Sequence, residues 1–252
     1  MYELLTISVL ETPAPITASC LTGNAAVVID VLRATSSIVT AISSGCRGVI
    51  PASSKEEALA LKAAHPDALL GGEIRSRKIE GFDLGNSPGD YSPQAVAGKR
   101  VIMTTSNGTK AILAAERGGA GPVFIASFLN LSAVAKRAWQ EMSREGKGLT
   151  IICSGSHGEP SLEDFACAGA LAKSVLNLEP KGAVSMDETA RKAAEVFESY
   201  RGDILRILQD SPHGRDLMEI GFGEDLRRAA AIDSMSVVPA FTGKAIVALD
   251  QR

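Results

Sequence analysis

The sequence is poor in aromatic residues and in cysteine. Of its 252 residues only 4% are aromatic, one is tryptophan and four are cysteine. The wide spacing of these cysteines, without a C-x-x-C motif, disfavours a structural zinc site, a redox pair or a disulfide scaffold. They are Cys20, Cys46, Cys153 and Cys167. We therefore expect a reduced, cytoplasmic protein.

An excess of basic charge is also missing. The chain has 26 Lys and Arg residues against 29 Asp and Glu residues, a formal net charge of −3. A dedicated nucleic-acid-binding protein needs a basic excess on one face to neutralise phosphates, so we expect no nucleic acid partner. The sequence also shows no signal-peptide pattern and no unbroken apolar run long enough to span a membrane, so we expect neither export nor membrane insertion.

Small and apolar residues dominate instead, in alternating strand and helix patterns. Hydrophobic residues make up 45% of the chain, which is enough to bury a core. The patterns predict strands within 25–30, 48–52, 67–72, 99–104, 121–127, 149–155 and 244–250, and helices within 31–46, 53–64 and 161–178. This alternation predicts an α/β fold with a mainly parallel sheet in a three-layer α/β/α arrangement. We expect one domain, 1–252, in which 183–235 form a helix-rich region that serves as a cap, an interface or an outer layer.

An internal repeat with an offset of 74 residues supports this fold. Ala34-Thr35 matches Gly108-Thr109, and Ile38-Val39 matches Ile112-Leu113. Chance similarity between two alanine-rich helices is the alternative, but the match runs ungapped through strand, loop, helix and strand and favours a duplicated βαβ unit. The loops at 33–37 and 104–109 are then structurally equivalent, and such loops border the ligand crevice of a parallel sheet.

Both loops carry hydroxyl and amide side chains at the expected start of a helix. Their sequences are RATSS and TTSNGT. Residues of this kind cap helices, and the same free N–H groups with the helix dipole also bind anions. Asp30 precedes the first loop, at the end of a very apolar strand, where a carboxylate is costly to bury without a cation or strong donors.

Two further segments are rich in charge. Segment 71–93 is either a solvated linker or a packed functional loop; its acids are Glu73, Glu80, Asp83 and Asp90, and its bases include Arg75, Arg77 and Lys78. Segment 153–169 contains the adjacent acids Glu163 and Asp164 at a predicted helix start, which suits a metal site or a simple dipole interaction. His157 is a candidate base or anion ligand, although a lone loop histidine often has no such role.

Several familiar mechanisms are missing from these loops. No D-x-D motif surrounds Asp30, Glu159 occupies the arginine position of a C-x5-R phosphatase motif at Cys153, and neither a G-x-S-x-G elbow nor a G-x4-G-K-[ST] loop is present. Without a standard nucleophile, the loops favour metal-assisted attack by water on an anionic, phosphorylated substrate.

Four segments together resemble the 2-phosphosulfolactate phosphatase (ComB) family: VVIDVLRATSSI, GGE followed by KIEGFDLGNSP, TTSNGT, and SLEDFACAG. The resemblance covers about residues 1–180 and implies a Mg2+-dependent phosphatase that hydrolyses (R)-2-phospho-3-sulfolactate to 3-sulfolactate and phosphate, a step in coenzyme M biosynthesis. The open alternatives are a phosphatase for another small phosphorylated hydroxy acid, phosphoryl transfer to an acceptor other than water, and a non-catalytic anion-binding protein.

The resemblance also implies roles for residues within these motifs. The implied Mg2+ ligands are Asp30, Glu73, Glu163 and Asp164. The implied phosphate or sulfonate contacts are Thr35, Ser36, Arg75, Lys78, Ser106, Asn107, Gly108 and Thr109. Asp30, Arg33 and Glu163 form the implied catalytic set, in which Arg33 holds phosphoryl oxygens and one acid orients the attacking water. A small phosphorylated anion is the expected partner, and the short apolar segments near the C-terminus are compatible with a homodimer.

Overall fold

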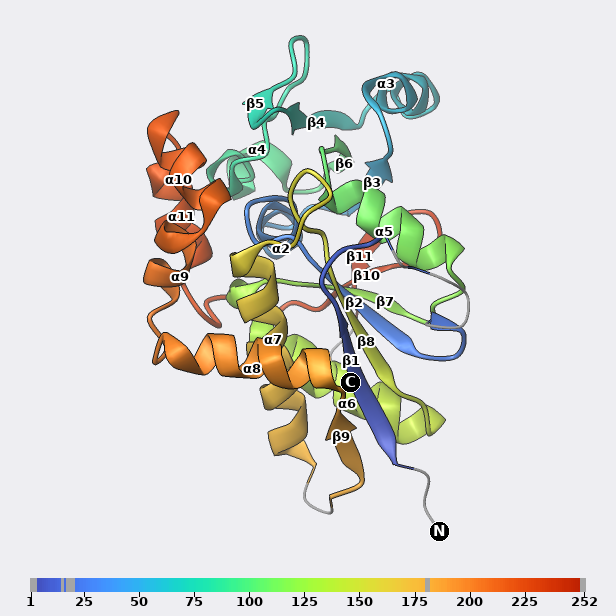
Figure 1. Cartoon of the computed structure of the whole chain (residues 1–252). Coiled ribbons are helices and arrows are strands. Elements are labelled where there is room, and N and C mark those ends of the chain that lie inside the picture. Colours follow the sequence, from blue (N-terminus) through green and yellow to red (C-terminus); the bar gives the residue numbers. More distant parts are fainter. Residues whose placement is uncertain (1–3, 15, 17–20, 180–181, 250–252) are drawn as a thin grey trace.

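A computed structural model describes residues 4–14, 16, 21–179 and 182–249 (Figure 1). The strands are β1 (Leu5–Leu10), β2 (Ala25–Ile29), β3 (Gly48–Ala52), β4 (Leu69–Ile74), β5 (Arg77–Lys78), β6 (Arg100–Thr104), β7 (Val123–Ala126), β8 (Leu149–Cys153), β9 (Val184–Met186), β10 (Pro239–Phe241) and β11 (Ile246–Ala248). The helices are α2 (Ala34–Ser43), α3 (Lys55–Ala64), α4 (Pro93–Val96), α5 (Gly108–Arg117), α6 (Leu131–Glu145), α7 (Leu162–Leu178), α8 (Glu188–Ser199), α9 (Ile204–Asp210), α10 (Pro212–Glu219) and α11 (Gly223–Ala229), with short 3-10 helices η1 (Pro88–Asp90) and η2 (Phe128–Asn130).

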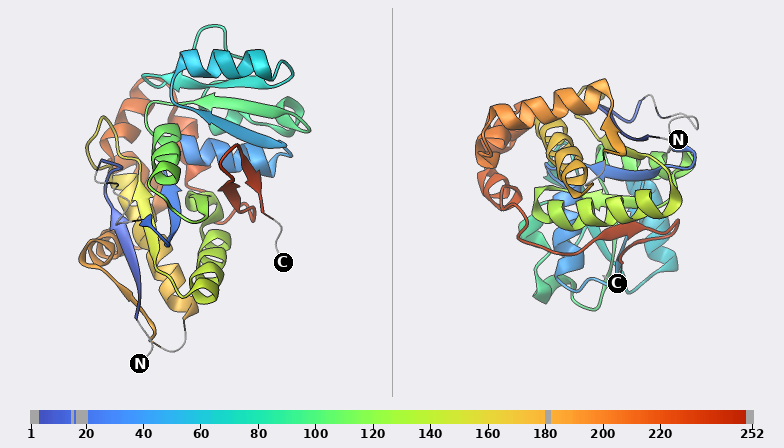
Figure 2. Two further views of the ribbon diagram at one scale, coloured as in Figure 1. Left: turned by 90° about the vertical axis from the view of Figure 1, so that its right-hand side faces the viewer. Right: turned by 90° about the horizontal axis from the view of Figure 1, so that it is seen from below.

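The strands form one sheet in the order β5-β4-β6-β3-β11-β10-β7-β2-β8-β1-β9. The strands from β4 to β3 and from β7 to β9 are parallel within each group, and the antiparallel β10–β11 hairpin joins the two groups. This hairpin, dark red in Figure 2, lies between the two halves of the molecule. The expected mainly parallel sheet with helices on both faces is confirmed.

Strand β2 shows why the sheet needs helices on both faces. Val27 and Ile29 pack into a core with residues of α6 and α7, whereas Ala26 and Val28 pack into a second core with residues of α2 and α5. Since successive side chains of a strand point to opposite faces, an unbroken apolar run is buried on both sides. A third, smaller core lies between α3 and the outer strands.

The predicted repeat matches the arrangement of the elements. Helix α5 begins and ends 74 residues after α2. Strand β2 of the first unit lies between β7 and β8 of the second, and β6 of the second lies between β3 and β4 of the first. Each unit therefore contributes its first strand to the half-sheet of the other, which brings the start of α2 next to the start of α5.

Some elements differ from the sequence prediction. The strands β1, β5, β9 and β10 and the helices α4 and α6 were not predicted, and region 183–235 contains β9 as well as the expected helices. The closing strand is β11; it pairs antiparallel with β3 through Ile246 and Val49. β9 and β10 have only three residues each, which is too short for a recognisable apolar pattern.

The cysteines Cys46, Cys153 and Cys167 are buried and free, while Cys20 lies outside the described residues. Within the described part of the chain, none of the helices combines the length and apolar character needed to cross a membrane.

Candidate active site

A narrow cavity lies at the carboxyl ends of β2, β4, β6 and β8. Its volume is about 30 Å³, close to the space of one water molecule. Two of its lining side chains, Arg75 and His157, are exposed. The lining residues are Asp30, Leu32, Arg33, Glu73, Arg75, Ser76, Asn86, Ser106, Asn107, Ser156, His157 and His213.

Matching threonines shape the two repeated loops. The hydroxyl of Thr35 accepts a hydrogen bond from the N–H of Asp30 (3.0 Å) and donates to the Asp30 carbonyl (2.8 Å). The hydroxyl of Thr109 makes the same pair of bonds with the backbone of Thr105, at 3.1 and 3.3 Å. Each hydroxyl thus closes its own strand-to-helix turn, so these two threonines serve the backbone of the loops.

Asp30 lies between the starts of α2 and α5. Its Oδ1 accepts a hydrogen bond from the N–H of Ala34 (3.1 Å). A Cβ at Gly108 would lie 2.6 Å from Asp30 Oδ2 and 2.5 Å from the Cβ of Ala34, so only glycine permits this approach of α5. Burial raises the pKa of Asp30 to about 7, with a further contribution from the charges of Glu73 and Glu163.

Glu73 joins the end of β4 to the loop after β6. Its carboxylate accepts hydrogen bonds from the N–H groups of Ser76 and Ser106, both at 2.7 Å. The preceding Gly72 has a φ of +134°, and a Cβ there would lie 1.9 Å from the carbonyl oxygen of Thr104. Glycine is therefore required for β4 to pass close enough to β6 for Glu73 to reach this loop.

Arg33 is the buried cation of the cavity. Its guanidinium donates to Asp225 Oδ2 (2.8 Å) and to the carbonyl of Ser76 (2.6 Å), and its Cζ lies 4.3 Å from the ring centre of Phe222. Ser87 donates a hydrogen bond to the other oxygen of Asp225. Elements from three distant parts of the chain therefore hold this side chain in one orientation.

The acids at the start of α7 differ in their partners. Asp164 accepts hydrogen bonds from the N–H groups of Val31 (2.8 Å) and Gly155 (3.2 Å). Glu163 is 2% exposed, and its Oε2 has no hydrogen-bond partner among the described residues. Burial raises the pKa of both carboxyl groups. Asp164 therefore ties the loops after β2 and β8 together, whereas Glu163 keeps a free oxygen.

The acids fit a divalent cation without forming a complete cage. Within the described residues, no three His, Cys, Asp or Glu side chains are close enough together to form a ready metal site. Mg2+, however, often takes only one or two protein carboxylates and fills its other positions with water and substrate phosphate. A bound cation would favour the ionised form of Asp30, whose pKa is raised, and would give the unpartnered oxygen of buried Glu163 a partner.

Comparison with known proteins identifies the family. The family model described as 2-phosphosulpholactate phosphatase matches residues 10–244. The chain belongs to the 2-phosphosulfolactate phosphatase family. It is 39% identical over 232 residues to a probable 2-phosphosulfolactate phosphatase of Symbiobacterium thermophilum, covering 91% of this chain and 96% of the relative. A protein with the same description from Thermotoga petrophila is 41% identical over 214 residues, covering 85% of this chain and 87% of the relative.

Family membership confirms the expected enzyme class, a phosphoric monoester hydrolase. Of the residues expected from the 2-phosphosulfolactate phosphatase resemblance, Asp30, Arg33, Glu73, Arg75, Ser106 and Asn107 line the cavity. Two other expected residues do not line the cavity but contact the strand-to-helix loop beside it. Ser36 donates to the carbonyl of Val31 (2.8 Å), and Gly108 packs against Asp30. The Lys78 ammonium donates to the carbonyl of Asp83 (2.8 Å), and this residue does not line the cavity.

The cavity also contains residues that sequence reasoning missed in this family member. Asn86 is buried and its Oδ1 has no hydrogen-bond partner in the described structure. Its place in the KIEGFDLGNSP motif was the available signal. His213 approaches from α10, where burial lowers the pKa of its imidazole. Two of the three histidines of the chain, His157 and His213, thus meet at this cavity.

Proposed function

We propose that this chain hydrolyses the phosphate ester of a small phosphorylated hydroxy acid, with (R)-2-phospho-3-sulfolactate as its substrate. The observation that carries this proposal is the meeting of Asp30, Arg33 and two helix N-termini at one cavity. A phosphoryl group needs donors for its oxygens and a group that orients water, and these residues supply both. The names of the relatives support the choice of substrate.

Arg33 would bind the phosphoryl oxygens. Its charge is paired with Asp225, yet a guanidinium has five N–H groups, and the structure engages two of its nitrogens in the bonds described above. The N–H groups at the start of α5 and the side chains of Ser106 and Asn107 would hold the remaining oxygens. Asp30 would orient the attacking water, because it lines the cavity and Glu163 does not.

We propose that the reaction also requires Mg2+. Asp30 and Glu163 would hold the ion, which when bound neutralises charge on the phosphoryl group. The oxygen of water would form a bond to phosphorus as the ester P–O bond breaks. The Asp30 carboxylate would accept the water proton, and the leaving oxygen of the hydroxy acid would take a proton from solvent. Arg75, which is exposed and lines the cavity, would bind the sulfonate or carboxylate of the substrate. Release of 3-sulfolactate would make this reaction a step in coenzyme M biosynthesis.

Phosphate release from (R)-2-phospho-3-sulfolactate, phospholactate and phosphoglycolate, each with and without Mg2+, tests the proposal. We expect Mg2+-dependent release with the sulfonated compound as the best substrate. Equal release from all three compounds would leave a phosphatase with another substrate. No release from any of them would contradict the proposed activity and favour a non-catalytic anion-binding protein.

A further inference from the structure

A second cavity lies at the opposite edge of the sheet. Its volume is about 350 Å³, and it is lined by the amino ends of β3, β4 and β6 and by the end of α3. The active-site cavity borders the carboxyl ends of β4 and β6, and a strand of five residues spans about 16 Å. The two cavities are therefore separate.

The charge of this second cavity is strongly positive. Arg47, Lys99 and Arg100 line it together with His65, and Asp67 is its one acid. The ion pairs between described residues all lie elsewhere, so none of these three cations is neutralised by a protein carboxylate. In a chain with more acids than bases, such a cluster is not a consequence of composition.

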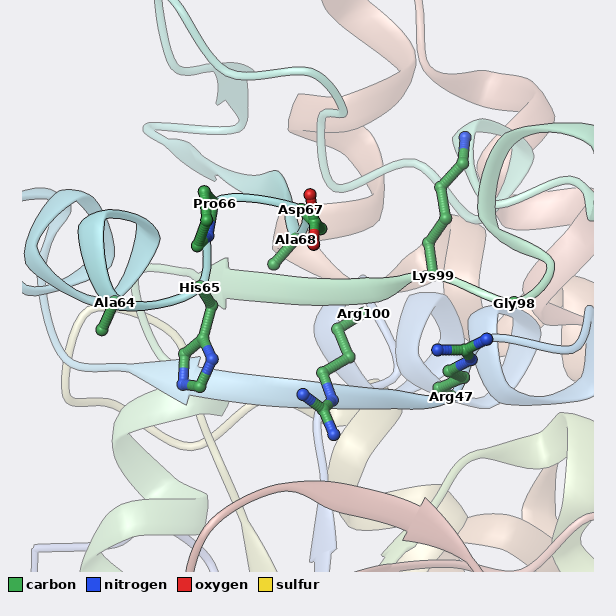
Figure 3. A pocket seen from close by; sticks show the side chains of 9 residues that line it. All are labelled: Arg47, Ala64, His65, Pro66, Asp67, Ala68, Gly98, Lys99 and Arg100. Atoms are coloured by element: carbon green, nitrogen blue, oxygen red, sulfur yellow. The ribbon is translucent and has the colours of Figure 1, made fainter.

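The Lys99 side chain is directed away from the other basic groups. In Figure 3 the Arg100 and His65 side chains extend downward in front of β3 and Arg47 lies at the start of that strand, whereas Lys99 extends upward. The Lys99 ammonium there donates to the carbonyl of Ala95 (2.8 Å). The working face of the cavity thus consists of two guanidinium groups and an imidazole.

The backbone beneath these groups is fixed. The N–H of Arg47 donates to the carbonyl of Lys99 (2.8 Å), and Gly48 is the direct neighbour of Arg100 in the β3–β6 pair. The turn that carries His65 is closed by Lys62, whose ammonium donates to the carbonyls of Pro66 and Ala68. These carbonyl groups are consequently turned toward Lys62, and the guanidinium groups start from rigid positions.

We propose that this cavity binds a small polyanion that carries two or more phosphate groups. Two guanidinium groups at the starts of adjacent strands can each form paired hydrogen bonds with a different phosphate, so a ligand with two phosphates gains more charge-assisted hydrogen bonds here than a single phosphate ion. The cavity volume falls within the range of small-molecule sites, and the alanines and proline of its lining offer little surface for an apolar ligand. This site is independent of the proposed phosphatase activity.

Calorimetric titration of the full chain with inorganic pyrophosphate at about 150 mM salt, without Mg2+, tests the proposal. The pocket variant is Arg47→Gln/Arg100→Gln. The control, Arg144→Gln/Arg227→Gln, makes the same change in net charge at two exposed arginines on helices α6 and α11. We expect at least tenfold weaker binding to the pocket variant, unchanged binding to the control, and at least tenfold weaker binding of orthophosphate to the unmodified chain.

Each other outcome overturns part of the proposal. Equal pyrophosphate affinity of the unmodified chain and the pocket variant would place any binding outside this cavity, and equal losses in both variants would reduce it to a net-charge effect. Equal affinities for pyrophosphate and orthophosphate would contradict a polyanion site. Phosphatase turnover should be the same in the pocket variant and the unmodified chain, and a loss with an unchanged melting temperature would contradict the separation of the two cavities.

Discussion

The guanidinium of Arg33 and the carboxylate of Asp225 form a buried ion pair with an N–O distance of 2.8 Å, although the two residues are 192 positions apart. Both side chains are less than 5% exposed. Helix α11 thereby fixes the cation that lines the candidate active site. Region 183–235 therefore contributes a side chain that orients Arg33.

The first prediction concerns Asp225. Asp225→Asn leaves the Arg33 charge buried without its partner, so we expect the free energy of unfolding to fall by roughly 2–4 kcal/mol. We also expect kcat/KM to fall by about 10–100-fold, because the guanidinium loses its orientation toward the phosphoryl oxygens. Denaturant unfolding and phosphate release measure the two effects. Glu224→Gln on the same helix, where the side chain is exposed, is the matched control; similar losses in both variants would show that α11 acts only through folding.

The second prediction is a pH dependence at Asp30. Because its pKa is raised from 3.8 to about 7, the metal-free folded chain holds a proton there that the unfolded chain releases above about pH 4. The group therefore lowers the free energy of unfolding progressively as pH rises from 4 to 7, and the penalty is complete above pH 7. Asp30→Asn removes it. We expect the free energy of unfolding of this variant to equal that of the unmodified chain near pH 4 and to exceed it by about 2–4 kcal/mol at pH 8. If the difference in the free energy of unfolding between the two proteins does not grow with pH, the penalty for burying an ionised Asp30 is contradicted.

The third prediction concerns the close approach of α5. A Cβ at Gly108 would collide with Asp30 and Ala34, so Gly108→Ala should push the start of α5 away from the cavity. We expect a loss of turnover of about 100-fold, since small displacements of positioned groups are costly. Gly223→Ala is the control: Gly223 likewise begins a helix, and a Cβ there meets only Met218 at 3.8 Å. Near-normal turnover of the Gly108 variant would remove α5 from the site.

The fourth prediction tests the proposed cation. Mg2+ that binds only the folded chain should raise its melting temperature by a few degrees, about 2–4 °C, at saturating concentration. Asp30→Asn and Glu163→Gln should reduce or abolish this shift, whereas exposed Glu159→Gln should retain it. Thermal scans with Mg2+ or with a chelator measure the shift. An undiminished shift in both buried-acid variants would assign the ion to other ligands.

The sequence was most informative where its pattern reflects a local constraint. The strands at 48–52 and 149–155 and the helix at 161–178 were recognisable, since strands buried on both faces are continuous apolar runs. The 74-residue repeat was visible for the same reason: the threonine-closed turns need Thr35 and Thr109 at equivalent positions. The sequence alone therefore predicts that Asp30 and Ser106 lie at the same end of the parallel strands.

Long-range contacts were beyond the reach of the sequence. Nothing local to Asp225 distinguishes it from the other acids of an amphipathic helical region, and its pairing with Arg33 depends on how α11 packs. The same holds for His213. The basic cavity combines Arg47, His65 and Arg100 from three separate segments, none of which forms a basic motif. Only the order of strands in the sheet brings such residues together.

The most direct test of the account is phosphate release from (R)-2-phospho-3-sulfolactate by the unmodified chain, Arg33→Met and Asp30→Asn in parallel, with folding verified for each. We predict Mg2+-dependent release by the unmodified chain and a loss of at least about 100-fold in both variants. Undiminished release by folded Arg33→Met and Asp30→Asn would contradict the assignment of the reaction to this cavity.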